Sequence, residues 1–156
     1  MKNEKTKIMV EAGGAIAVLL GLVFVAFELR QNTEAVEAAT FQALTDASSN
    51  YILSIASDPE LNRIVTTGHV DPAALNEQEY ARYFMVNRSY WVRMQNVYSQ
   101  WQRGTLSNDD WLLYKSVICS SGENLNSSQG LMQTFDEHRL LLTPKFVQFV
   151  EHCWGN

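Results

Sequence analysis

The most constraining feature of this 156-residue chain is an uncharged, apolar run near its N-terminus. The run extends from Ala12 to Phe27 and is bounded by Glu11 and Glu28. With the adjoining apolar residues it covers residues 8–29, a segment about 33 Å long as an α-helix at a rise of about 1.5 Å per residue. The hydrocarbon core of a bilayer is about 30 Å thick, so residues 8–29 are predicted to form a single transmembrane anchor.

A signal peptide and a buried core helix are the alternatives to a membrane anchor for this run. A secretory signal peptide would also combine a basic start with an apolar middle, but cleavage after Ala26 would place the bulky Phe24 at the −3 position. A buried core helix is less favoured, because the run has no polar face. The sequence therefore favours an uncleaved anchor.

The charges around the anchor predict its orientation. Residues 1–7 form a basic tail that carries Lys2, Lys5 and Lys7, whereas Arg30 is the only basic residue soon after the anchor. Loops rich in Lys and Arg stay in the cytoplasm. The N-terminus is therefore expected in the cytoplasm of a bacterium, with the following domain in the periplasm.

Residues 30–156 form the predicted soluble domain, which turn signals divide into helices. Asp58-Pro59 is typical of an N-cap followed by a first helical residue, and that short helix is expected to end by Gly68. Asn76 and Glu79 have capping-box spacing, and Gly104 is a stop signal. Further helices are expected from about 107, over 132–142 and from 143, with a polar loop over 120–130. No segment shows strand alternation, so the predicted fold is all-α: one transmembrane helix followed by a small helical bundle.

The predicted helix over 77–103 carries an aromatic stripe. Its apolar positions are Tyr80, Phe84, Trp91, Met94, Tyr98 and Trp101, and the opposite side holds Arg82, Ser89, Arg93, Asn96, Gln100 and Arg103. An apolar face is also expected from Phe41, Leu44, Tyr51, Ile52 and Ile55. The aromatic stripe is interpreted as bundle core rather than as a ligand groove or a base-stacking surface. Asn87 lies on the stripe and needs a hydrogen-bonding partner.

The composition argues against several function classes. A formal net charge of −5 disfavours nucleic acid as a partner, since phosphate binding needs clustered Lys and Arg. No metal, phosphate-loop or nucleophile motif occurs, so no catalytic, cofactor-binding or metal residue is predicted. His152-Cys153 could be an activated nucleophile, but a structural thiol is favoured.

The two cysteines, Cys119 and Cys153, are candidates for a disulfide bond. They could pair if the domain is periplasmic, and they would be free thiols in the cytoplasm. The sequence alone does not show that the two thiols come within bonding distance.

Small residues recur every four positions in the anchor, at Gly13, Ala17 and Gly21. This spacing lines one helix face with small side chains, which allows a second helix to approach closely. The spacing predicts a helix–helix contact, although Gly and Ala are common in membrane helices and such matches also arise by chance.

Three segments carry a resemblance to a known family. They are Glu28–Thr33 at the end of the anchor, Tyr98–Leu106 leading to Trp111, and the closing Thr143–Val150. In these segments the chain resembles a widespread bacterial family of uncharacterised, small, membrane-anchored helical proteins. The resemblance implies the same architecture and adds no catalytic residue.

Two function classes follow. The first is a non-enzymatic interaction or accessory protein that binds the lipid bilayer and another membrane protein or a copy of itself. The second is a sensor or small-ligand-binding domain with a pocket between helices; Arg88 or Arg93 buried against aromatic rings would favour it. An enzyme ranks third, and no cofactor is expected.

Overall fold

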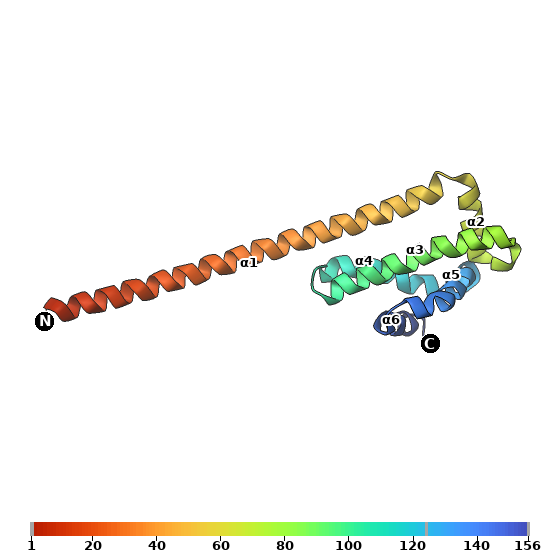
Figure 1. Ribbon diagram of the computed structural model, residues 1–156. Helices are drawn as coiled ribbons and strands as arrows, with labels where there is room; N and C mark the ends of the chain where they lie inside the picture. Colours follow the sequence, from red (N-terminus) through yellow and green to blue (C-terminus); the bar gives the residue numbers. More distant parts are fainter. Residues whose placement is uncertain (1, 124, 156) are drawn as a thin grey trace. The chain divides into compact units, whose positions relative to one another are not determined.

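The computed structural model describes residues 2–123 and 125–155, and every regular element within them is helical, with no strand. The six α-helices are α1 (Lys2–Ala56), α2 (Pro59–Val70), α3 (Glu77–Gln102), α4 (Asn108–Glu123), α5 (Leu125–His138) and α6 (Pro144–Trp154), shown in Figure 1. Short 3₁₀ turns cover Pro72–Ala74 and Arg139–Leu141. The predicted all-α fold is confirmed. The chain divides into two compact units, residues 1–39 and 40–156.

The first unit is the N-terminal part of α1. Its large apolar side chains between Ile16 and Leu29 are each more than half exposed. From Gly13 onward, α1 is long and apolar enough to cross a membrane by length and composition. The side chains of Lys2, Lys5 and Lys7, and those of residues 8–10, lie outside the described part. This unit is therefore an apolar helix whose described side chains are not buried by protein.

The second unit begins with the end of α1 and turns into α2 at Asp58. The Asp58 carboxylate accepts hydrogen bonds of 3.0 Å from the backbone N–H groups of Glu60 and Leu61, and Pro59 occupies the first turn, as predicted. The helix runs on to Val70, two residues past its predicted end at Gly68. The isolated glycine does not stop it, because Ile64, Val65 and Gly68 are all buried against other helices.

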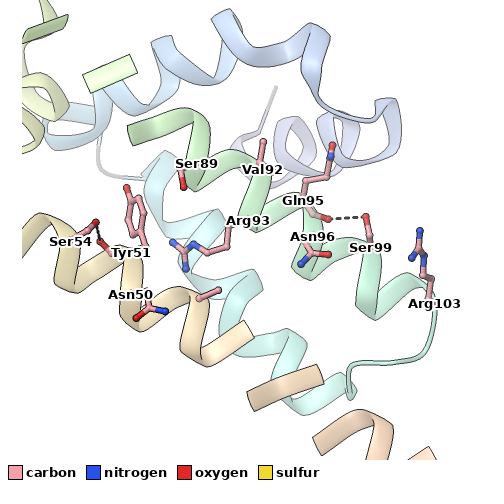
Figure 2. Close-up of a pocket in the computed structure, with 11 residues that line it drawn as sticks. Asn50, Tyr51, Ser54, Ser89, Val92, Arg93, Gln95, Asn96, Ser99 and Arg103 are labelled. Atoms are coloured by element: carbon pink, nitrogen blue, oxygen red, sulfur yellow. Dashed lines mark hydrogen bonds between the residues drawn. The ribbon is translucent and has the colours of Figure 1, made fainter. Parts of the chain in front are cut away.

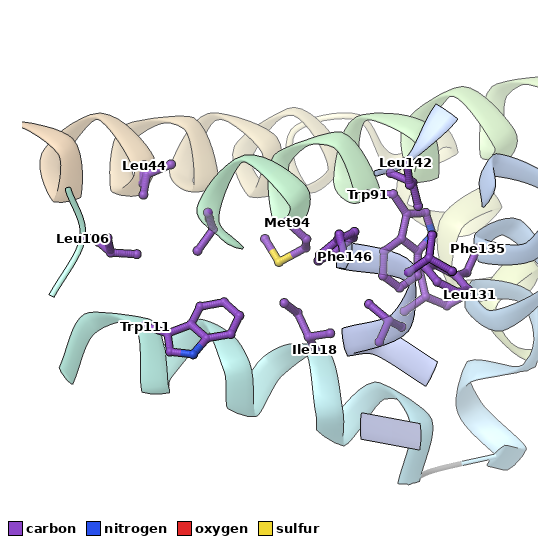
Figure 3. Close-up of a cluster of buried hydrophobic side chains, with 13 residues drawn as sticks. Leu44, Trp91, Met94, Leu106, Trp111, Ile118, Leu131, Phe135, Leu142 and Phe146 are labelled. Atoms are coloured by element: carbon purple, nitrogen blue, oxygen red, sulfur yellow. The ribbon is translucent and has the colours of Figure 1, made fainter. Parts of the chain in front are cut away.

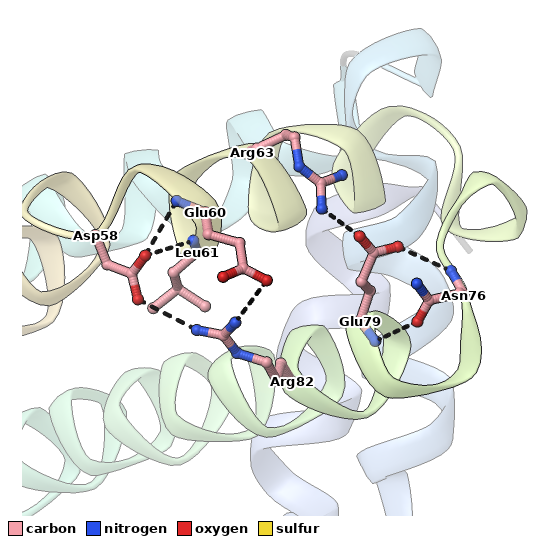
Figure 4. A network of polar contacts seen from close by, with 7 residues as sticks. All are labelled: Asp58, Glu60, Leu61, Arg63, Asn76, Glu79 and Arg82. Carbon is pink, nitrogen blue, oxygen red and sulfur yellow. Dashed lines mark hydrogen bonds and ion pairs between the residues drawn. The ribbon is translucent and has the colours of Figure 1, made fainter.

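Helix α3 begins with the predicted capping box. The Asn76 side chain accepts a 3.0 Å hydrogen bond from the Glu79 N–H, and the Glu79 carboxylate accepts one of 3.0 Å from the Asn76 N–H. The helix ends before Gly104, whose φ of +71° is a left-handed conformation that favours glycine. Ion pairs join α2 to the start of α3: Arg82 contacts Asp58 and Glu60 at 3.2 Å each, and Arg63 contacts Glu79 (Figure 4).

The prediction of a polar loop over 120–130 is wrong, because the residues that the structure describes there are helical. Helix α4 continues to Glu123 and α5 starts at Leu125, and only residue 124 lies outside the described part. Serine and asparagine are weak helix formers, but the stretch contains no proline to stop a helix. Packing of the neighbouring Ile118 and Leu131, which are both buried, favours helix on each side.

The core of the second unit is built from the aromatic stripe of α3, as predicted. Trp91 and Met94 are fully buried (Figure 3). Tyr98 and Trp101 are partly buried and pack against the same cluster. The other buried members come from α1, α3, every later helix and two connections; they are Leu44, Val97, Leu106, Trp111, Ile118, Leu131, Phe135, Leu142, Phe146, Val147 and Val150. The apolar face predicted for the end of α1 is confirmed at Leu44, which is buried. The prediction is wrong at Ile52, which is exposed.

Asn87 is fully buried on this stripe, and its side-chain amide donates a 2.9 Å hydrogen bond to the Tyr83 carbonyl oxygen. The expected polar partner is therefore present, on the preceding turn of the same helix. Tyr83, Ile64 and Leu75 form a second, smaller apolar cluster between α2 and α3.

Candidate functional site

An open groove of about 790 Å³ lies between the end of α1 and α3, inside the second unit (Figure 2). Helix α1 contributes Ala47, Asn50, Tyr51 and Ser54, and helix α3 contributes Ser89, Val92, Arg93, Gln95, Asn96 and Ser99, with Arg103 just beyond its end. Most of these side chains carry amides or hydroxyls. Two are arginines and none is a carboxylate.

Arg93 is the centre of this groove. Its guanidinium lies 4.6 Å from the centroid of the Tyr51 ring and 5.6 Å from that of Tyr90. Its Nη1 donates a 2.6 Å hydrogen bond to the Ser48 hydroxyl. Two aromatic faces and one hydroxyl thus hold the cation in a fixed place between α1 and α3.

The charge of Arg93 has no carboxylate partner within the part of the chain that the structure describes. The Nε–H is buried and makes no hydrogen bond with the described residues. Burial disfavours the charged form of each group. It therefore lowers the pKa of the Arg93 guanidinium and raises the pKa of the Tyr51 hydroxyl. An arginine stays charged even so, and a partly desolvated cation without a counter-ion favours the approach of an anion.

The sequence places Arg93 on the side of its helix opposite the aromatic stripe, and its burial against aromatic rings is the condition that favours a ligand pocket. The end of α1 covers this side of α3, so Arg93 is half-buried, whereas Arg88 is exposed. Tyr90 precedes Arg93 by three residues and therefore shares its helix face, which is the signal that could have marked the position. The condition that favours a pocket, an arginine against aromatic rings, is met by Arg93 and not by Arg88.

The small residues of the anchor all lie on α1, in the first unit. A Cβ atom added at Gly13 or Gly21 would have no neighbour within 4 Å, and Ala17 is exposed. Within the first unit, no described residue covers Gly13 or Gly21. A helix–helix contact at Gly13, Ala17 and Gly21 stays a prediction.

The structure brings the two cysteines together. Cys119 in α4 and Cys153 in α6 are joined as a disulfide, with 5.1 Å between their Cα atoms. The pairing ties the last helix to α4, against which it packs. Whether the bond forms in the cell depends on the compartment and stays a prediction.

No group of three or more His, Cys, Asp or Glu side chains that could hold a metal ion occurs among the described residues. His69, His138 and His152 lie in three different helices and do not form a common site. Comparison with protein-family models, curated proteins and solved structures finds no match to this chain.

Proposed function

We propose that this protein is a membrane-anchored, non-enzymatic interaction or accessory protein of the bacterial inner membrane. Residues 8–29 would cross the bilayer, and the helical domain of residues 30–156 would bind another membrane protein. The observation that carries the proposal is the row of exposed apolar side chains from Ile16 to Leu29. Each such side chain is stabilised by about 1.5–3 kcal/mol on leaving water, so lipid is the surrounding that this helix favours. The resemblance to a bacterial family of membrane-anchored helical proteins is part of the same proposal.

A periplasmic location for the domain is also proposed. It is supported by the three lysines that precede the anchor, because basic segments stay in the cytoplasm. The closeness of Cys119 and Cys153 is a second support, since disulfide bonds persist in the oxidising periplasm.

Membrane fractionation tests the proposal. The full-length protein should pellet with membranes, resist carbonate extraction and need detergent, and deletion of residues 1–29 should release a strongly helical, water-soluble fragment. A signal peptide would instead give a mature N-terminus after Ala26. A soluble full-length chain or such a processed form would contradict the anchor. A C-terminal alkaline phosphatase fusion should be active, and an inactive one would reverse the orientation.

A small-ligand sensor is the second candidate function. The specific observation in its favour is the half-buried Arg93 between Tyr51 and Tyr90, which could hold a small anion. Native mass spectrometry of protein released gently from membranes separates the two candidates. A retained mass of a few hundred daltons would support the sensor, and a retained second protein chain would support the interaction protein.

A further inference from the structure

We propose that the groove between the end of α1 and α3 binds an acidic segment of a different protein, with Arg93 and Arg103 facing its carboxylates. This inference rests on the proposed function, an interaction protein, and names the chemistry of the partner at the groove. It is carried by the charge, the geometry and the shape of the groove.

The charge of the groove is opposite to that of the whole chain. The chain has a formal net charge of −5, whereas the groove carries two arginines and no acidic side chain. The net charge of the chain therefore opposes an acidic segment, whereas the arginines of the groove attract it. Such complementarity steers encounter and fixes the register of a bound segment.

The geometry of Arg93 suits a carboxylate. The rings of Tyr51 and Tyr90 and the Ser48 hydroxyl already hold the guanidinium, so little side-chain entropy remains to be lost when a ligand binds. Ser48 occupies Nη1, and Nη2 makes no hydrogen bond within the described chain. Charge-assisted hydrogen bonds from arginine to carboxylate are among the strongest in proteins.

The shape of the groove suits an elongated occupant. Along α3 it extends from Ser89 to Arg103, which is about 21 Å at a rise of about 1.5 Å per residue. Arg93 and Arg103 are about 15 Å apart on the same measure, so two acidic residues of one segment could face them. Small-molecule sites are usually enclosed and bury most of the ligand surface, whereas this groove is open along its length.

Some polar side chains of the groove have no hydrogen-bond partner among the described residues. Asn50 and Ser89 make no side-chain hydrogen bond with the described residues, and they lie on opposite walls (Figure 2). They can bond the backbone of a bound segment. A second copy of this chain is a poorer occupant, because a two-fold interface would bring the same patch, with its arginines, against itself.

The experiment uses the full-length protein in its native membranes. A photo-crosslinking amino acid replaces Ser89 or Asn96, both of which line the groove, and the cross-linked peptide is sequenced by mass spectrometry. The matched control position is Leu113, an exposed residue of α4 outside the groove. The expected result is a cross-link at Ser89 and Asn96 to a segment rich in Asp or Glu from one other protein, and none to that segment at Leu113.

Two charge reversals test the role of the arginines. Arg103→Glu should reduce the cross-link roughly tenfold, since a like charge opposes the acidic segment. Arg88→Glu is the control, because Arg88 is an exposed arginine of α3 outside the groove, and it should change little. Both positions are exposed, so neither variant disturbs the core.

Several results would overturn the inference: a segment without acidic residues, a second copy of the chain, an adduct of only a few hundred daltons, or a cross-link that Arg103→Glu leaves unchanged. If the protein co-purifies with a membrane partner but gives no cross-link from the groove, the groove is not the binding site. The proposed function is then unaffected. A chain that is soluble, or free of any partner in mild detergent, overturns both.

Discussion

Gly68 in α2 and Gly130 in α5 lie so close together that a Cβ atom at Gly130 would collide with the Gly68 carbonyl oxygen. The same added atom would lie 2.7 Å from the Tyr83 hydroxyl. A Cβ at Gly68 would in turn meet the Tyr83 ring at 2.6 Å. Helices α2 and α5 can therefore pack at this distance only because Gly130 lacks a side chain, and the Tyr83 ring of α3 fits against α2 only because Gly68 lacks one.

The first prediction follows from this contact. Gly130→Ala should lower the free energy of unfolding by about 1–3 kcal/mol, because the backbone of α2 must move to make room. The change is measured by thermal or urea unfolding of the detergent-solubilised protein. Gln129→Ala is the matched control, since Gln129 is the exposed neighbour on the same helix, and it should leave the stability nearly unchanged. Equal stability of the two variants would contradict the close packing.

The second prediction concerns the disulfide. Cys119 and Cys153 are 34 residues apart in sequence, so their bond restricts the unfolded chain, and the double Cys→Ser variant should be less stable by about 2–4 kcal/mol. Dithiothreitol should destabilise the wild type by a similar amount and leave the variant unaffected. Wild-type protein isolated with thiols blocked should also change mobility on reduction in a denaturing gel. Labelling of both cysteines by the blocking reagent would show that the bond is absent in the cell.

The third prediction concerns pH and His69, which packs edge-on against the Tyr83 ring at 5.7 Å between centroids. Burial lowers the pKa of the His69 imidazole, an effect that the nearby Asn87 side chain opposes more weakly. The folded state therefore binds fewer protons than the unfolded state just below pH 6.5, so this contribution to stability is present above pH 6.5 and is lost as the pH falls toward the lowered pKa.

His69→Gln should accordingly reduce the fall in melting temperature between about pH 7 and about pH 5. The control is His152→Gln, which removes an exposed histidine and should leave that fall unchanged. An NMR titration of the imidazole measures the pKa directly. A His69 pKa above the ordinary value would reverse the sign of the effect and contradict the prediction.

The fourth prediction concerns Arg93 as a link between α1 and α3. Arg93→Met should destabilise the protein by about 1–2 kcal/mol, because it removes the hydrogen bond to Ser48 and the cation–π contacts. The loss is partly offset, since the variant no longer buries a charge at this position. Arg88→Met changes an exposed arginine of the same helix and should have little effect. If both variants unfold alike, the contacts of Arg93 add nothing to the bundle.

Local signals in the sequence were enough to place the start of α2 and both ends of α3. Asp58-Pro59, the Asn76–Glu79 box and Gly104 act through hydrogen bonds and backbone preferences within a few residues, and the structure has them where the sequence predicts. The polar stretch over 120–130 was misjudged for the opposite reason. Its helical state depends on packing of the flanking helices, which local composition does not record.

The sequence by itself determined the apolar character of α1, the all-α class and the core face of α3, because each follows from periodicity or composition along one element. The tertiary structure alone decided which side of α3 is covered by the end of α1, and so placed Arg93, half-buried, in a groove between them. It alone also brought Cys119 to Cys153 and Gly68 to Gly130. These contacts join residues far apart in sequence, and their distances depend on how whole helices pack.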